Sequence, residues 1–231
     1  MCFDVEGDEQ LFCGKEYIGA NSLKPHQPDD SAIEIFRQFV HNTLAANVKK
    51  PLRYLSKNNN NILRLTVLHK AFPDATIIIP FRDPIQQAVS SHRQHAHFIE
   101  RHKQDSFSRK YMDWLGHFEF GSHHKPFAFF SSKHSNYTPE NIEYWIEYWI
   151  HVHQYLVGTA PDTCIFLSYD QLCKAPQELC ERLWSVVGLD THCIKETRSH
   201  FRSHQHPEPS IPEQLKSEAY SIYHALEKKA L

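Results

Sequence analysis

The segment ATIIIPFRDPIQQAVSSHRQH, residues 75–95, predicts a buried strand that passes directly into a helix. Residues 76–81 form a continuous apolar run, which is typical of a strand covered on both faces in a parallel sheet. Asp83 is a favoured N-cap residue, Pro84 suits the first helical position, and Gln86 stands where a capping-box partner would. A helix is therefore expected from Pro84 onward, with a buried stripe formed by Ile85, Ala88, Val89, Ala96 and Ile99.

Arg82 and Ser90 are the candidate ligand-binding residues of this segment. Arg82 stands at the carboxyl end of the strand, where open α/β sheets bind ligands, and Ser90 lies about two helical turns after Asp83. The helix N-terminus adds amide donors and the positive end of a dipole. A phosphate fits these groups, because a guanidinium can hold it with two hydrogen bonds and a hydroxyl adds a third. The simpler alternative is a salt-bridged Arg82 beside a capped helix.

Helix and strand signals alternate along the rest of the chain, which is the pattern of an α/β domain. Helices are expected after Ser31, after an N-cap at Asn61, from Thr138 and Pro139 onward, over residues 176–190 with an end at Gly188, and around residues 215–226, and further strands over residues 51–57 and 162–170. We interpret residues 1–231 as a single domain. Residues 103–137 are aromatic and rich in histidine and serine, and we expect this segment to be a lid or insertion.

Composition limits the class of partner and the compartment. The chain has 25 lysine and arginine residues against 27 aspartate and glutamate residues, and its pI is about 6.8. This balance provides no basic field for a phosphate backbone, so a nucleic-acid partner is disfavoured. There is no run of about 18 apolar residues and no leader-like N-terminus, which favours a cytoplasmic protein without a membrane segment. Scattered cysteines with no C-x-x-C pair favour reduced thiols over a disulfide framework.

The segment FPDATIIIPFRDPIQQAVSS resembles the 3′-phosphate-binding segment of sulfotransferases, in which a strand ends in arginine, Asp-Pro or Asn-Pro follows, and serine comes eight residues after the arginine. Arg82 and Ser90 occupy these positions. RYLSKNNNNILRL is similar to the family strand that delivers a lysine to the sulfuryl group, here Lys57. CIFLSYDQLCKAP is similar to the strand whose Tyr-Asp element places an aromatic ring near the adenine, here Tyr169. YMDWLGHFEFG resembles a bacterial-type branch of the family.

The resemblance implies a fold, a donor and a class of acceptor. The fold is a P-loop NTPase-like α/β domain, with a parallel sheet in a three-layer arrangement. The donor is 3′-phosphoadenosine 5′-phosphosulfate (PAPS), which leaves as adenosine 3′,5′-bisphosphate (PAP). The sulfuryl group passes to a hydroxyl or amine of a small-molecule or carbohydrate acceptor. No motif encodes the identity of that acceptor, since an aromatic lid accepts sugars, phenols and lipid headgroups alike.

One family element has no counterpart in this sequence: the Gly-x-x-Arg-Ser-Gly-Thr-like loop whose amide groups hold the 5′-phosphosulfate after the first strand. The chain has seven glycines, and Gly14 with Lys15 lacks the required spacing and a following serine or threonine. We interpret the chain as a truncated form with an incomplete sheet and an aromatic cap, and a decayed paralogue is the alternative. The strands at 76–81 and 163–168 are then expected to have a gap between them or to pair abnormally.

The resemblance also implies catalytic roles. Lys57 would stabilise the bridging oxygen as the phosphate leaves, without a metal ion. Many soluble members place a histidine base two residues after this lysine, but Asn59 stands there in this chain, so His117 and Glu119 are the candidate bases. The structural alternatives are a solvated strand-end lysine for Lys57, an ordinary half-buried tyrosine for Tyr169, and a loop-bracing pair for His117 and Glu119.

Two other functions remain open from the sequence. The first is a non-catalytic paralogue that keeps the 3′-phosphate pocket and binds a nucleotide or a protein through the aromatic lid. The second is a histidine-dependent metal hydrolase, because the 18 histidines include His92, His95 and His102 at helical spacing and the adjacent His123 and His124. No H-E-x-x-H motif or matching carboxylate accompanies them, which favours structural or solvated histidines over metal ligands.

Overall fold

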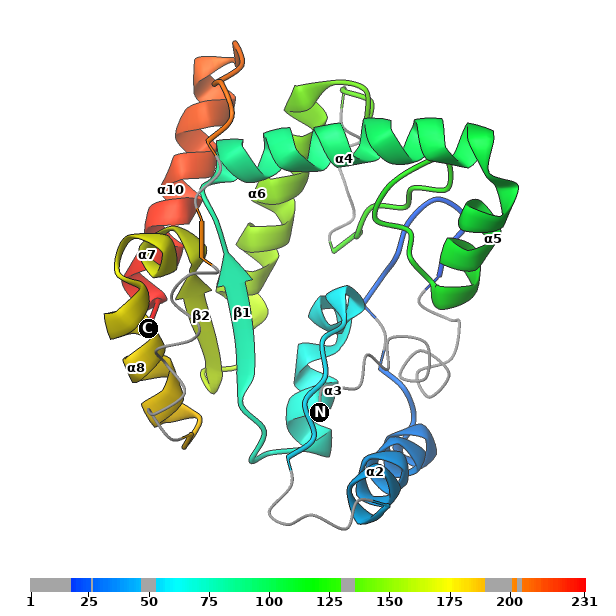
Figure 1. Ribbon diagram of the computed structural model, residues 1–231, viewed down its shortest axis with the longest axis vertical. Coiled ribbons are helices and arrows are strands. Elements are labelled where there is room, and N and C mark those ends of the chain that lie inside the picture. Colours follow the sequence, from blue (N-terminus) through cyan, green and yellow to red (C-terminus); the bar gives the residue numbers. More distant parts are fainter. Residues whose placement is uncertain (1–17, 26, 47–52, 130–135, 190–200, 203–204) are drawn as a thin grey trace. The chain divides into compact units, whose positions relative to one another are not determined.

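The computed structural model describes residues 18–25, 27–46, 53–129, 136–189, 201–202 and 205–231, and it divides into two compact units. The first unit comprises Met1–Ala75 and His95–Lys133, and the second comprises Thr76–Gln94 and His134–Leu231. The elements, in chain order, are α2 (Asp30–Ala45), the 3-10 helix η1 (Asn59–Arg64), α3 (Leu65–Ala71), β1 (Ile77–Phe81), α4 (Pro84–Gln104), α5 (Ser106–Leu115), α6 (Ile142–Thr159), β2 (Cys164–Ser168), α7 (Tyr169–Lys174), α8 (Pro176–Val186) and α10 (Glu213–Lys229), as labelled in Figure 1.

The second unit is built on a parallel pair of strands, β1 and β2, which lie side by side in Figure 1. They pair in register from Ile77 opposite Cys164 to Phe81 opposite Ser168. Of the two expected outcomes, a gap between these strands is wrong, because they hydrogen-bond directly to each other, and an abnormal pairing stays a prediction. Among the described residues the sheet has these two strands alone, and the pairing supports the α/β, parallel-sheet class. The full three-layer sheet and its incompleteness stay predictions.

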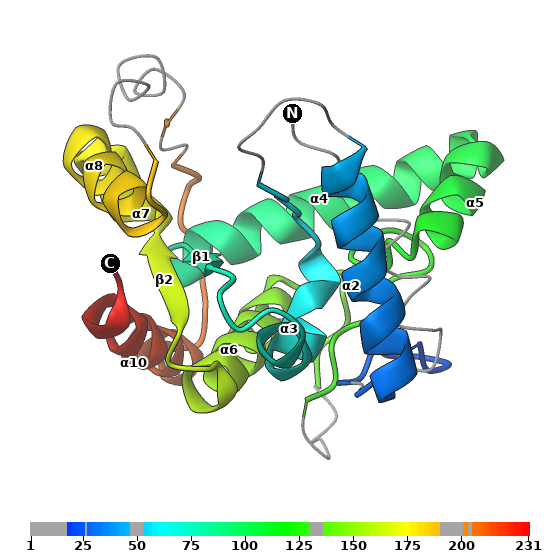
Figure 2. The same ribbon diagram turned by 90° about the horizontal axis from the view of Figure 1, so that it is seen from below.

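Helices lie on both sides of β2, with α6 and α10 packed together on one side and α7 and α8 on the other (Figure 2). The alternation of side chains along a strand explains this arrangement. Leu167 contributes to a core cluster with Leu172, Leu179 and Cys180 of α7 and α8. Phe81 points to the other side, where its ring meets the Tyr223 ring of α10 at 5.7 Å.

The predicted burial of β1 on both faces is only half correct. Phe81 is 2% exposed, whereas Ile78 is 38% exposed and Pro80 is also exposed. Residues of one strand that are two apart share a face, so Ile78 and Pro80 form a face of β1 that the described part of the chain leaves open. On the outer edge of β2, the Leu231 amide donates to the Phe166 carbonyl at 2.9 Å, so the end of the sequence extends the pairing.

The first unit contains α2 and α3, which Arg37 connects at the end of α3. Its guanidinium donates to the carbonyls of Ala71 at 2.9 Å and Lys70 at 3.0 Å, which satisfies acceptors that a helix C-terminus leaves open. The α2 helix begins at Asp30, slightly earlier than the expected start after Ser31, because Asp29 caps it by accepting a hydrogen bond from the Ala32 amide at 2.8 Å. The helix over residues 30–45 confirms the expectation drawn from its start signal.

One predicted strand and two predicted helix starts in the chain are wrong. Residues 53–57 of the expected strand are irregular, and residues 51–52 lie outside the described residues. The following helix is capped by Asn58, not Asn61, since the Asn58 side chain accepts from the Asn60 amide at 2.8 Å and a 3-10 turn forms first. The α6 helix starts at Ile142, not at Thr138, because Thr138 forms a turn with Asn141 that precedes it.

Other sequence expectations agree with the described elements. Gly188 adopts a φ of 61° just after α8, a conformation that favours glycine and ends the helix. In α10, Ala219 and Leu226 are fully buried.

No helix in the described ranges combines the length and the apolar composition needed to cross a bilayer. Cys164, Cys173 and Cys180 are free thiols, and Cys2, Cys13 and Cys193 lie outside the described residues.

Candidate functional site

The carboxyl ends of β1 and β2 bring together two of the predicted site residues. Phe81 pairs with Ser168, so Arg82 and Tyr169 follow the two strands at the same edge of the sheet. The Cζ atom of Arg82 lies 5.8 Å from the centre of the Tyr169 ring, which is within the range of a cation–π contact. Residues 87 positions apart in the sequence thus form one cationic and aromatic surface. This is the edge at which open α/β sheets bind ligands.

Each of these residues is followed by an aspartate, and the two aspartates organise the start of α4. The Asp83 amide donates to the Asp170 carboxylate at 2.6 Å, and the Gln86 amide donates to the Asp83 carboxylate at 2.9 Å. Asp83 is therefore the N-cap, as predicted. The reciprocal half of the capping box is supplied by Asp170 and not by Gln86. Two amide donors expected to face a phosphate at this helix start are occupied by carboxylates of the chain itself.

Two tyrosines of α10 complete this arrangement. The Tyr220 hydroxyl donates to Asp83 at 3.0 Å, and the Tyr223 hydroxyl donates to Asp170 at 3.1 Å. Burial, followed by the negative charge of the neighbouring aspartate, raises the pKa of both phenols above the ordinary range. Both tyrosines therefore stay protonated donors. The sequence predicted α10 but not this role, since an amphipathic pattern does not reveal what its polar edge contacts.

Gln86 instead holds the segment around His206. The His206 amide donates to the Gln86 side-chain oxygen at 2.6 Å, and the Gln86 amide group returns a bond to the His206 carbonyl at 3.1 Å. Arg93 donates to Nδ1 of His206 at 2.9 Å. Ser90 lies on α4 between Gln86 and Arg93 and is half-buried. Its hydroxyl makes no hydrogen bond to another described residue. Its hydroxyl is therefore able to contact a ligand.

Tyr169 is the first residue of α7 and sits partly beneath the later chain. Its hydroxyl donates to the Arg202 carbonyl at 3.0 Å. Burial and a hydrogen bond with Cys173 raise the pKa of Tyr169 and outweigh the opposing effect of Arg82. The ring is held by its hydroxyl at one end and faces the Arg82 guanidinium, so it is oriented and not simply packed.

The first unit brings the two candidate bases together with Asn59. Nδ1 of His117 lies 3.3 Å from a Glu119 carboxylate oxygen, and the Asn59 side-chain amide donates to Glu119 at 2.9 Å. Burial alone would raise the pKa of Glu119, but the hydrogen bonds from His117 and Asn59 prevail and hold that pKa below its ordinary value. Glu119 is therefore an ionised acceptor near neutral pH. Lys57 is exposed and lies two residues before Asn59, in the irregular segment that leads into η1.

The histidines suspected as metal ligands contact different parts of the chain. His92 bonds to the Glu140 carbonyl at 2.9 Å, and the buried His95 accepts from the Gly121 amide at 3.2 Å. His102 contacts Ser122 at 3.1 Å. Gly121 has a φ of 85°, and a Cβ there would lie 2.4 Å from the His102 ring, so these histidines pack against a loop that requires glycine. Among the described residues, no three His, Cys, Asp or Glu side chains gather as a metal would need.

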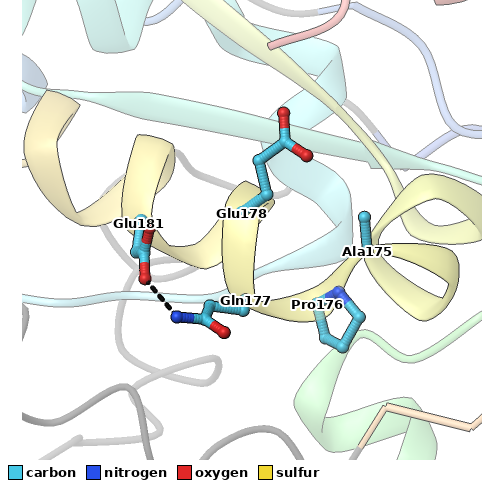
Figure 3. Close-up of a pocket in the computed structure, with 5 residues that line it drawn as sticks. All are labelled: Ala175, Pro176, Gln177, Glu178 and Glu181. Carbon is cyan, nitrogen blue, oxygen red and sulfur yellow. Dashed lines mark hydrogen bonds between the residues drawn. The ribbon is translucent and has the colours of Figure 1, made fainter.

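A surface hollow lies at the start of α8, and its lining differs from the groups described above. It has a volume of about 330 Å³ and is lined by Ala175, Pro176, Gln177, Glu178 and Glu181. Figure 3 shows Gln177 and Glu181 joined by a hydrogen bond of 2.7 Å, while Glu178 points away from that pair. The hollow contains none of the predicted site residues, and two carboxylates make it a poor site for a phosphate or a sulfate.

Comparison with known proteins identifies the first half of the chain. Residues 15–126 match the sequence model of the sulfotransferase family, which is just under half of the chain. This part of the chain is similar to the sulfotransferase family. The match confirms the resemblance found from the sequence and supports a sulfotransferase-like function in general. No curated protein and no solved structure gave a significant match.

Most of the predicted site residues of this sulfotransferase-like chain lie inside the matched segment. These are Lys57, Arg82, Ser90, His117 and Glu119. Tyr169 lies beyond it, so its place beside Arg82 comes from the paired strands and not from the family match. The structure groups Arg82 with Tyr169 in the second unit and His117 with Glu119 in the first.

Proposed function

We propose that the chain binds PAPS or PAP at the carboxyl edge of β1 and β2. Arg82 would hold the 3′-phosphate with its guanidinium, Ser90 would add a hydroxyl, and Tyr169 would offer its ring to the adenine. The observation that carries this proposal is the Arg82–Tyr169 contact of 5.8 Å, formed by residues that follow two adjacent parallel strands. A cation and an aromatic face side by side match a ligand that carries a phosphate next to a base.

Hydrogen bonds already made at the start of α4 limit which groups could hold the phosphate. The Asp83 and Gln86 amides already donate to Asp170 and Asp83, so the phosphate contact would depend mainly on the Arg82 and Ser90 side chains. Side-chain recognition of this kind is sensitive to single substitutions. Removal of a guanidinium that makes charge-assisted hydrogen bonds costs about 2 kcal/mol or more, whereas removal of a hydroxyl costs about 1 kcal/mol.

The proposed reaction is sulfuryl transfer to a hydroxyl or amine of a small-molecule or carbohydrate acceptor. The acceptor proton would pass to Glu119, with His117 and Asn59 fixing the carboxylate, while the acceptor oxygen or nitrogen forms a bond to sulfur. The bond between sulfur and the 5′-phosphate oxygen breaks, and the electron pair leaves with PAP. Lys57 would stabilise the charge on that oxygen. The ionised state of Glu119 supports its assignment as the base.

Calorimetric titration with PAP tests the donor site. Arg82→Ala is expected to weaken PAP binding by more than tenfold, and Ser90→Ala by roughly fivefold, which corresponds to about 1 kcal/mol. Arg101→Ala is the matched control, because Arg101 is an exposed arginine near the end of the same helix that pairs only loosely with Asp105, at 3.8 Å. It should bind PAP like the wild type. No binding by the wild type, or unchanged binding by Arg82→Ala, would refute the donor site.

Transfer of labelled sulfate from PAPS separates the enzyme from a binding paralogue. A chain that binds PAP and transfers no sulfate to phenolic, amine or carbohydrate acceptors would be a nucleotide-binding relative. In an active chain, Glu119→Gln is expected to lower turnover by at least a hundredfold while PAP affinity stays unchanged, because a general base contributes about 10²–10⁴ in rate. An equal loss of PAP affinity would remove Glu119 from the role of base.

A further inference from the structure

Three aromatic side chains project from one face of α5 into solvent. Phe107 is 62% exposed, Tyr111 is 50% exposed and Trp114 is 73% exposed. Their positions differ by four and then three residues, so they follow one stripe of the helix. Large aromatic side chains are usually buried in a folded protein. A continuous exposed stripe of them therefore marks an interaction surface. We call Phe107, Tyr111, Trp114 and the exposed Lys110 between them the α5 ridge.

The rings of the α5 ridge support one another and not the core. The Phe107 and Tyr111 rings are stacked with centres 5.9 Å apart, and the Trp114 ring meets Phe107 edge-on at 6.5 Å. The opposite side of the helix makes the attachments: Met112 contacts His102, and Asp113 bonds to His123 at 2.8 Å. The aromatic stripe therefore faces solvent, because Met112 and Asp113 attach the opposite side of α5 to the rest of the unit.

Both ends of α5 are fixed, so the helix does not depend on its aromatic stripe for its shape. Asp105 caps the start by accepting from the Phe107 amide at 3.0 Å, and Gly116 ends the helix with a φ of 71°. Figure 1 shows α5 as a short separate helix after the end of α4. Ten residues span about 15 Å, which is long enough to present three rings in a row.

The charges next to the ridge are positive. Within the described ranges, Arg109 and Lys110 make no ion pair, while the nearby Lys103 pairs with Glu100 at 3.5 Å. The only acidic residue of α5, Asp113, is paired with His123. Lys110 lies beside the aromatic stripe, whereas Arg109 lies on the opposite side of the helix, so an anionic partner would meet the aromatic rings beside the Lys110 ammonium group.

The shape and size of the ridge point away from a small ligand and from a protein partner. Small molecules bind in concave sites, whereas the ridge is the convex side of a helix. Three aromatic side chains offer about 150–250 Å² each, so their exposed share amounts to roughly 300–450 Å². A standard protein interface buries about 800 Å² on each partner. Trp, Tyr and Phe beside Lys and Arg are instead typical of helices that lie in the membrane interface.

We propose that the α5 ridge docks the protein on an anionic lipid surface. The helix lies parallel to the bilayer, Phe107 and Trp114 enter the headgroup region, and Lys110 contacts the anionic headgroups. This attachment is peripheral and reversible, because one short helix provides only a few hundred Å² of apolar surface. The ridge belongs to the first unit and the proposed PAP site to the second, and the attachment does not depend on sulfuryl transfer.

Co-sedimentation with vesicles tests the attachment. The wild type is expected to bind vesicles of phosphatidylcholine with 30% phosphatidylserine at least tenfold more strongly than pure phosphatidylcholine vesicles, and 0.5 M NaCl should remove most of this preference. The double variant Phe107→Ser, Trp114→Ser should lose at least tenfold in binding. The variant Lys110→Glu should lose the preference for phosphatidylserine.

The control is Ile35→Ser, which replaces another apolar residue of the same unit that is 55% exposed, on α2. It should bind vesicles like the wild type, and circular dichroism should show all variants folded. Absence of wild-type binding overturns the proposal, as does equal binding by the Phe107→Ser, Trp114→Ser variant. Sedimentation velocity without lipid provides a second check: a dimer that this double variant abolishes would assign the ridge to a second copy of the chain and overturn the lipid assignment.

Discussion

Asn59 is a single residue whose structural role differs from that of its family counterpart. It stands two residues after Lys57, where many soluble sulfotransferases carry a histidine base, and an amide cannot accept a proton from an acceptor hydroxyl. Its side chain donates to Glu119 at 2.9 Å instead. The position that would supply the base therefore contacts the residue we propose as the base. The proposed base of the first unit is therefore Glu119 and not residue 59.

Asn59→Ala is expected to raise the pKa of Glu119, because this change removes one of the two hydrogen bonds that favour the ionised carboxylate. The free energy of unfolding should fall by about 1 kcal/mol at pH 7. Carbon-13 NMR titration of the Glu119 carboxyl group measures the first effect, and urea denaturation the second. Asn61→Ala is the control from the same asparagine run and should leave Glu119 unchanged. An unaltered Glu119 pKa in Asn59→Ala would show that His117 alone holds the carboxylate.

At the scale of elements, α10 and the two strand ends form one hydrogen-bonded unit. Asp170 accepts from the Asp83 amide and from the Tyr223 hydroxyl, so a carboxylate after β2 caps α4 and fastens α10 at the same time. Tyr220 repeats the contact on Asp83. Because the same acceptor serves two elements, the loss of Asp170 leaves two donors without their partner, and a partly buried donor without a partner costs more than the bond was worth.

Asp170→Ala should lower the free energy of unfolding by about 2–3 kcal/mol, and Tyr223→Phe by about 1 kcal/mol. The double variant should be less destabilised than the sum of the two, by about 1 kcal/mol, since both changes remove the same bond. Urea denaturation of the four proteins gives this cycle. Asp162→Ala, at an exposed aspartate before β2, is the control and should be near neutral. Strict additivity would mean that Tyr223 and Asp170 do not interact in solution.

Local sequence signals predicted the elements better than their partners. The Asp83-Pro84 start of α4, the β2 strand and the glycine after α8 depend on neighbouring residues, and these were correct. The strand expected at 51–57 failed because its apolar residues are few and no partner strand pairs with it in the described ranges. Asn58 prevailed over Asn61 because several adjacent asparagines can all cap a helix, and the sequence does not rank them.

In the candidate site, too, local sequence signals predicted the positions of residues better than their contacts. The motif placed Arg82 and Tyr169 at strand ends, and the register of β1 and β2 then fixed their contact. Tyr220, Tyr223 and the Gln86 contact with His206 depend on segments more than 50 residues away, which no local pattern specifies. Glu119 was proposed from the sequence, but its hydrogen bond to Asn59 was not.

At the scale of the whole molecule, each unit contains a histidine that stays neutral: His124 is half-buried and His153 is fully buried. Burial lowers the pKa of His124 in the first unit to about 4, and the same cause lowers the pKa of His153 in the second unit to about 4. His124 donates from Nδ1 to the Phe118 carbonyl and faces the His95 ring at 5.5 Å, with Glu119 as the nearby acidic group. His153 stacks on Trp149 at 3.9 Å and bonds to its carbonyl.

Acid should therefore destabilise both units. An unfolded histidine has a pKa of about 6.5, so between pH 6.5 and pH 4 the unfolded chain binds protons that the folded chain does not. The stability contributed by each neutral histidine is complete above this window and is lost as the pH falls through it, by about 2 kcal/mol per histidine between pH 7 and pH 5. Urea denaturation at these two pH values measures the loss. His124→Phe and His153→Phe should each reduce it in their own unit, whereas His151→Phe, at an exposed histidine of α6, should not. An equal loss in His153→Phe and in the wild type would mean that other groups carry the acid response of the second unit.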